Sequence, residues 1–154
     1  MKTRLNTYAA APEQMRTLID FSTAMAKIGI DESLHNLINI RVSQINGCSF
    51  CLHMHSREAL AAGESELRIT MLGAWHESPL YSDRERAALA WAEALTRLPE
   101  TGAPDDVYAA MAEHFSPEEQ VKLTMAIGMI NLWNRFGVGF RGIHPGAAHQ
   151  AAAA

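Results

Sequence analysis

The sequence lacks the features that mark several large classes of protein. It has no cluster of lysine and arginine, and 17 acidic residues outnumber 13 basic ones, for a formal net charge of -4. We therefore expect neither nucleic acid nor an anionic membrane as a partner. Residues 1–7 are not followed by the apolar segment of a secretory signal, and the most apolar stretch, 121–140, is interrupted by polar residues such as Lys122 and Arg135. These absences predict a cytoplasmic chain.

The alternation of apolar and polar residues that is typical of strands is also missing, as are repeats of fixed period and linker-like segments. The chain has 154 residues, 48% hydrophobic and 19% charged, which is enough for one domain with its own core. We expect helices over residues 12–29, 31–46, 48–62, 65–72, 84–98 and 105–115, and a seventh from Pro117 onward. The prediction is a single all-α domain over residues 1–141, followed by a flexible tail over residues 142–154.

Several residue types mark the ends of these helices. Asp31 is placed to cap the second helix and Gly47 to end it, while residues 82–85 resemble a capping box. Ser116 and Pro117 are typical of the cap and first position of the last helix. That helix is apolar on nearly every side, so it is either central to the core or covered by another subunit. We expect a homo-oligomer.

Cysteine is scarce: the chain has two, Cys48 and Cys51, three residues apart. That spacing is close to one helical turn, so both sulfurs share a face of a helix that starts after Gly47, and His55 falls on the same face. A dithiol with an imidazole one turn away supplies a thiolate, a resolving sulfur and a base, as thiol–disulfide chemistry requires. In a reducing compartment such a pair is redox-active or metal-binding rather than a structural crosslink.

Two arguments disagree on which cysteine forms the thiolate. The unpaired N–H groups and the dipole at the start of the helix favour Cys48, whereas the imidazole of His55 favours Cys51. The residues alone leave this choice open.

Other interpretations of the cysteine pair are an unreactive buried pair and a zinc site formed with His53 and His55. Zinc sites commonly draw their ligands from two separate segments, and His53 points away from the face shared by Cys51 and His55. We therefore predict no metal. Because the chain has no Gly-rich nucleotide-binding loop, we also expect no organic cofactor.

The wider motif resembles a known family. The pattern Ser43-Gln44-x-Asn46-Gly47-Cys48-x-x-Cys51-x-x-x-His55 is similar to the core of the alkylhydroperoxidase AhpD-like proteins, within the carboxymuconolactone decarboxylase family. The segments 75–77 and 85–96 resemble one branch of that family, and the similarity covers most of residues 15–140.

This resemblance implies an all-helical domain that assembles into trimers or hexamers and acts as a dithiol peroxidase on hydrogen peroxide or organic hydroperoxides. It implies that Cys51 attacks the peroxide and becomes a sulfenic acid, and that Cys48 resolves this acid to a disulfide. An external dithiol partner then reduces the disulfide. His55 belongs to the proton relay.

The chain departs from the family pattern at the relay. Well-known members carry a glutamate where this chain has Asn36, and a histidine between the cysteines where it has Ser49 and Phe50. Asn36 can hydrogen-bond but cannot accept a proton. We therefore predict that Glu93 supplies the carboxylate, because its apolar neighbours on the helix should partly bury it and raise its pKa.

Two carboxylates have structural explanations that compete with this assignment. Glu93 can form a helical ion pair with Arg97, four residues later. Glu85 is the second choice for the relay, and its place in the capping box already explains it.

Two further functions compete with the peroxidase. One is decarboxylation or isomerisation of a muconolactone-type acid, for which Arg41 is the candidate carboxylate-binding residue and for which a dithiol is not needed. A buried Arg41 paired with a carboxylate is the structural alternative. The other is a non-enzymatic redox sensor with slow peroxide chemistry, which Asn36 favours.

Overall fold

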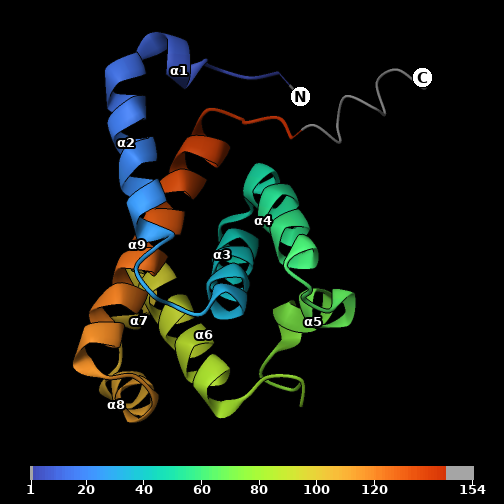
Figure 1. Cartoon of the computed structure of the whole chain (residues 1–154), viewed down its shortest axis with the longest axis vertical. Coiled ribbons are helices and arrows are strands. Elements are labelled where there is room, and N and C mark those ends of the chain that lie inside the picture. The colour runs from blue at the N-terminus through green and yellow to red at the C-terminus, as the bar shows by residue number, and fades with distance from the viewer. Residues whose placement is uncertain (1, 145–154) are drawn as a thin grey trace.

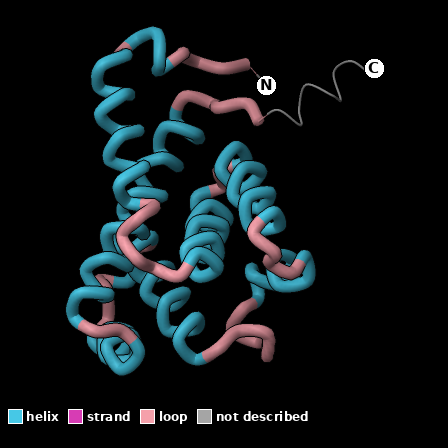
Figure 2. Tube along the Cα trace, in the orientation of Figure 1, coloured by secondary structure: helices cyan, strands magenta, loops and turns pink. Residues whose placement is uncertain are grey.

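The computed structural model describes residues 2–144, and every regular element in that range is a helix (Figures 1 and 2). The elements are α1 (Thr7–Ala10), α2 (Pro12–Met25), α3 (Glu32–Asn46), α4 (Ser49–Ala61), α5 (Glu66–Met71), the 3-10 helix η1 (Leu72–Ala74), α6 (Asp83–Thr96), α7 (Leu98–Thr101), α8 (Asp105–His114) and α9 (Pro117–Gly139). The all-α class is confirmed. The predicted tail lies outside the described residues from residue 145 onward.

The seven predicted helices correspond to α2, α3, α4, α5, α6, α8 and α9, and their caps confirm the boundary signals. Asp31 Oδ1 accepts the N–H of Leu34 at 3.1 Å, and Gly47 ends α3 with a φ of 67°. Ser82 and Ser116 each begin a complete capping box, with the glutamate three residues later. Local side-chain chemistry is therefore sufficient to place these ends.

Some helix boundaries and short elements differ from the prediction. The first long helix, α2, ends at Met25 rather than near Gly29, because the Lys27 N–H turns back to Ala24 in a tighter turn. α1 and α7 were not predicted. Each is a single turn without a buried residue, so neither leaves an apolar period in the sequence. α7 is separate from α6 because Pro99 has no N–H to continue the preceding helix.

α3 lies at the centre of the fold and packs against α4, α6 and α9 (Figure 1). Its neighbouring residues Leu37 and Ile38 are both fully buried but belong to different apolar clusters. One cluster joins Ile38 to α6, α8 and α9, and the other joins Leu37 to η1 and α6. Fully burying one such side chain contributes about 1.5–3 kcal/mol to stability. Apolar contacts on two sides therefore hold α3 in place.

α9 is buried on one face only. Leu123 and Ile127 pack into the core, whereas Val121 is 60% exposed and Met125 and Leu132 lie on the outer face. The apolar character of this helix therefore has two origins, a core face and a face that is uncovered in the single chain. No helix within residues 2–144 has the length and apolarity that crossing a membrane requires.

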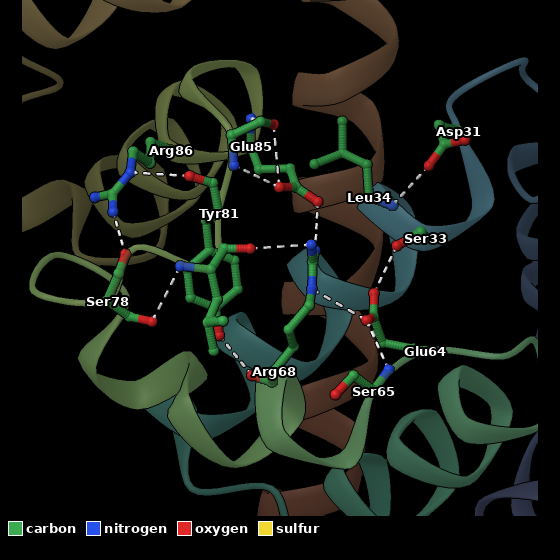
Figure 3. A network of polar contacts seen from close by, with 12 residues as sticks. Asp31, Ser33, Leu34, Glu64, Ser65, Arg68, Ser78, Tyr81, Glu85 and Arg86 are labelled. Atoms are coloured by element: carbon green, nitrogen blue, oxygen red, sulfur yellow. Dashed lines mark hydrogen bonds and ion pairs between the residues drawn. The ribbon is translucent and has the colours of Figure 1, made fainter.

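A polar network fastens α5 to the start of α6 and to the start of α3 (Figure 3). Arg68 pairs with Glu85 and with Glu64, whose Oε2 accepts the Ser33 hydroxyl at 2.6 Å. Glu85 also accepts the N–H of Ser82 at 2.8 Å. The capping and structural explanation of Glu85 is thus confirmed.

Candidate active site

The cysteine pair lies where α3 turns into α4. Gly47 adopts the left-handed conformation that ends α3, and Cys48 follows in an extended conformation as the N-cap of α4. The predicted helix start at Cys48 is therefore early by one residue. Because Cys48 stands at the cap, its Sγ accepts the backbone N–H of Cys51 at 3.3 Å, as a capping serine or aspartate oxygen would.

Both cysteines are free thiols and both are buried, Cys48 at 0% exposure and Cys51 at 3%. The side-chain hydrogen bond from Cys51 lowers the pKa of Cys48 to about 6 against the opposing effect of burial, and the Cys51 N–H, Asn134 and His55 lower it further. The same side-chain hydrogen bond raises the pKa of Cys51, and burial and the charge on Cys48 add to this effect. The pKa of Cys48 is therefore the lower of the two, and the thiol of Cys51 rather than the helix terminus is the main cause.

One wall of the pair is the backbone of α9 at Gly137. A Cβ atom at this position would lie 2.5 Å from Cys48 Sγ and 3.5 Å from Cys51 Sγ. Only glycine leaves room for both sulfurs here. The sequence contains a weak signal of this contact, because a glycine inside a helix costs about 1 kcal/mol relative to alanine and usually has a packing reason.

Asn134, one turn before Gly137, is buried at 1% exposure beside the pair. Its Nδ2 donates to Ser43 Oγ at 3.1 Å, and its Oδ1 accepts from Asn46 Nδ2 at 2.9 Å. Ser43 and Asn46 are residues of the motif that precedes the cysteines. They therefore orient a side chain of α9, which is a role that sequence spacing does not reveal.

His55 follows the pair on α4, and its partner is Glu58. His55 Nδ1 lies 2.8 Å from Glu58 Oε2, and this hydrogen bond is the main cause that lowers the pKa of Glu58. His55, Glu58, His35 and Asn36 line a cavity of about 590 Å³. Burial lowers the pKa of His35, and the nearby His55 adds to this effect. Glu58 was not predicted, although its i,i+3 spacing from His55 is a signal in the sequence.

Glu93 occupies a different part of the fold, and its predicted raised pKa is wrong. Its Oε1 accepts from Arg41 Nε at 2.6 Å and from Trp75 Nε1 at 2.7 Å, and its Oε2 lies 3.7 Å from His76 Nε2. Burial alone would raise the pKa of Glu93, but the Trp75 and Arg41 hydrogen bonds and the Arg41 charge lower it. The structure does not bring Glu93 to His55. Arg41 is a mostly buried arginine, its side chain 13% exposed, and it pairs with a carboxylate, that of Glu93. Glu93 therefore pairs with Arg41 rather than with Arg97.

Cys51 opens onto a second cavity, of about 440 Å³, which is mostly apolar. Its aromatic lining comes from Tyr8, Phe50, Trp133, Phe136 and Phe140. The N-terminal segment forms part of its wall and is held at the end of α9, where the N–H of Arg4 donates to the Phe140 carbonyl at 3.0 Å. Cys48 is not among the lining residues, so Cys51 is the sulfur that a molecule in this cavity meets.

His53 points away from the pair, as its position on the helix predicts. Its ring stacks on His144 with centroids 4.9 Å apart. Within residues 2–144, no three His, Cys, Asp or Glu side chains are grouped so that they could hold a metal ion. The site thus consists of two thiols that share a hydrogen bond and a histidine–carboxylate pair on the same helix.

Comparisons with known proteins agree with the motif. A model of the carboxymuconolactone decarboxylase family matches residues 12–94. The Bacillus subtilis protein YdfG is 41% identical over 138 residues, covering 90% of this chain and 94% of YdfG. An Agrobacterium tumefaciens protein of unknown function, described as a candidate antioxidant defence protein AhpD, superposes with a TM-score of 0.92 at 46% identity, covering 94% of this chain and 99% of that one. The debrominase Bmp8 shares the fold at 20% identity, with a TM-score of 0.83 and coverage of 94% and 77%.

Proposed function

This chain belongs to the carboxymuconolactone decarboxylase family, and we propose that it is a thiol-dependent peroxidase that reduces hydrogen peroxide or organic hydroperoxides through a Cys48–Cys51 disulfide. The observation that carries the proposal is that the two cysteines lie in different environments. Cys48 has the lowered pKa, and Cys51 faces the apolar cavity. The similarity to the Agrobacterium protein supports an antioxidant role.

In the proposed reaction, the proton of the Cys51 thiol passes to the Cys48 sulfur, and the Cys51 thiolate attacks one peroxide oxygen. The O–O bond breaks, Cys51 becomes a sulfenic acid, and the leaving alkoxide or hydroxide takes up a proton. The Cys48 thiol then attacks the sulfenic sulfur, so that the S–S bond forms and water leaves. An external dithiol reduces the disulfide and restores both thiols.

His55 completes the proposed proton relay. It lies one turn after Cys51 and is held by Glu58, and its effect on the pair is to lower the pKa of Cys48, so its proposed role is to stabilise the Cys48 thiolate from which the relay starts. Glu93 is left out of this scheme, because its carboxylate is bound by Arg41 and Trp75.

The proposal is tested by counting free thiols in chelator-washed, reduced protein before and after one equivalent of cumene hydroperoxide. We expect the count to fall from two to none per chain within seconds. Cys51→Ser should abolish peroxide turnover, whereas Cys48→Ser should form one sulfenic acid per chain and stop there. Two thiols remaining in the native protein, or full activity in both variants, would exclude the peroxidase.

The two alternative functions have less support. The guanidinium of Arg41 is already paired with Glu93, which leaves it poorly suited to bind a lactone carboxylate. Turnover of a muconolactone that survives loss of both thiols would revive that function. A peroxide rate constant no higher than that of a free thiol of the same pKa would favour the redox sensor.

A further inference from the structure

The proposed reaction moves a negative charge between two buried sulfurs, and a buried charge needs a hydrogen-bond donor at each position it occupies. The backbone N–H of Cys51 serves Cys48, at 3.3 Å from its Sγ. The same N–H also lowers the pKa of Cys51, so one backbone donor is shared between the two sulfurs. A second donor, from a side chain, would let the charge stay hydrogen-bonded as it moves.

Asn134 is the polar side chain of α9 on the face toward the pair. Gly137, three residues later on the same face of the helix, approaches both sulfurs so closely that a Cβ would contact each of them. Asn134 itself is buried at 1% exposure, one turn away. It therefore lies at the cysteine pair without being part of the cysteine motif.

The orientation of the Asn134 amide is fixed by its neighbours. Its Oδ1 accepts from Asn46 Nδ2 at 2.9 Å, which leaves the Nδ2 group to face the other way. One of the two Nδ2 hydrogens is used by Ser43 Oγ at 3.1 Å. Within the described residues, no oxygen or nitrogen acceptor takes the other, and a buried donor of this kind requires a partner.

We propose that Asn134 is a catalytic residue that binds the thiolate of this dithiol, donating its second Nδ2 hydrogen to Cys48 at rest and to Cys51 during attack. The charge then stays hydrogen-bonded while the proton moves the other way. Consistent with this geometry, Asn134 lowers the pKa of both thiols. The thiolate-binding role stands by itself, whereas the catalytic role rests on the proposed peroxidase.

Asn134→Asp keeps the shape and the acceptor for Asn46 but replaces the donor to sulfur with a carboxylate, whose negative charge also raises a thiol pKa. Asn131→Asp is the matched control, since Asn131 also accepts from Asn46, at 3.0 Å, one turn earlier on α9. The readout is the rate of iodoacetamide alkylation of the reduced full-length protein between pH 4.5 and 9. His55 is the other titratable group acting on Cys48, and both variants retain it.

We expect Asn134→Asp to move the midpoint of the alkylation profile up by about one pH unit and to slow alkylation at pH 5 about tenfold. Asn134→Leu, which removes the donor without adding a charge, should move the midpoint in the same direction, while Asn131→Asp leaves it in place. A folded Asn134→Asp protein with the native midpoint would overturn the proposal. Because no peroxide is used, this outcome is independent of whether the protein is a peroxidase.

A second measurement needs no variant, should Asn134→Asp fail to fold. The side-chain amide protons of Asn134, followed by NMR in the native reduced protein, should titrate with the same midpoint as the thiol. The Asn131 amide should not follow that titration. An Asn134 resonance that stays constant across the thiol titration would overturn the proposal.

Discussion

Cys48 and Cys51 share one proton near neutral pH, and the pair takes up a second proton when the pH falls below the pKa of Cys48. Because that pKa is lowered to about 6, the thiolate is present above this value and is lost as the pH falls through it. We expect the rate of disulfide formation with cumene hydroperoxide to be nearly constant from pH 7 to 8, and to fall about tenfold per pH unit below 6. Stopped-flow measurement of the rate against pH tests this. A rate that keeps rising to pH 9, as for an ordinary thiol, would contradict it.

Gly137 gives a second prediction for a single residue. Gly137→Ala places a methyl group 2.5 Å from Cys48 Sγ, so the sulfur or α9 must shift. We expect a loss of about 1–3 kcal/mol in the free energy of unfolding, together with slower alkylation of the pair. Urea denaturation and iodoacetamide kinetics measure the two effects.

Gly128→Ala is the matched control for that substitution, because Gly128 lies on the same helix and no atom is within 4 Å of a Cβ added there. Because alanine has a higher helix propensity than glycine, this substitution should instead raise the free energy of unfolding by up to about 1 kcal/mol. Equal effects of the two substitutions would show that the contact with sulfur is unimportant.

At the scale of the helix, Cys48 also has a structural role as the N-cap of α4. Cys48→Ser keeps an acceptor for the Cys51 N–H, whereas Cys48→Ala removes it. We expect the alanine variant to be less stable than the serine variant by about 1 kcal/mol, as for other lost caps. Thermal unfolding of both reduced variants tests this. If the two melt together, the sulfur does not cap the helix.

Helices with caps and an apolar period were predictable from the sequence, and single turns were not. The capping boxes at Ser82 and Ser116 and the stop at Gly47 depend only on neighbouring residues, so local chemistry locates them. Of the residues in the site, the sequence predicted only those at the start of α4 and on α4 itself. Glu58 carries a local signal in its spacing from His55, but Asn134 reaches the pair only because α9 packs on α3 and α4. Contacts of this kind depend on tertiary packing, which helical periodicity does not encode.

For the whole molecule, the family inferred from the motif is confirmed by the match over residues 12–94, while the oligomer remains a prediction. The neighbouring helices α2 and α9 both carry uncovered apolar side chains, including Phe21 at 49% exposure and Val121 at 60%. Exposed apolar side chains of this kind are typical of a surface that meets another subunit. We expect light scattering to give a trimer or a hexamer, a multiple of the 16.9 kDa chain.

Phe21→Glu should dissociate that oligomer, because it would bury a charge at the contact. Leu67→Glu is the control, since Leu67 is 58% exposed on α5, away from α2 and α9. A native protein of monomer mass, or dissociation by the control alone, would exclude this interface.

The position of Cys48 at the start of α4 also bears on where the electrons come from. Its thiolate is stabilised only while the pair is reduced, because a disulfide carries no charge for the Cys51 N–H to solvate. Stabilising the reduced form raises the reduction potential of the couple above that of a dithiol with ordinary pKa values. The shift favours reduction of the pair by an external dithiol, such as a donor of the thioredoxin type at about -270 mV. The lowered pKa of Cys48 thus favours electron flow from an external dithiol into the pair, which is the direction that the proposed reaction needs.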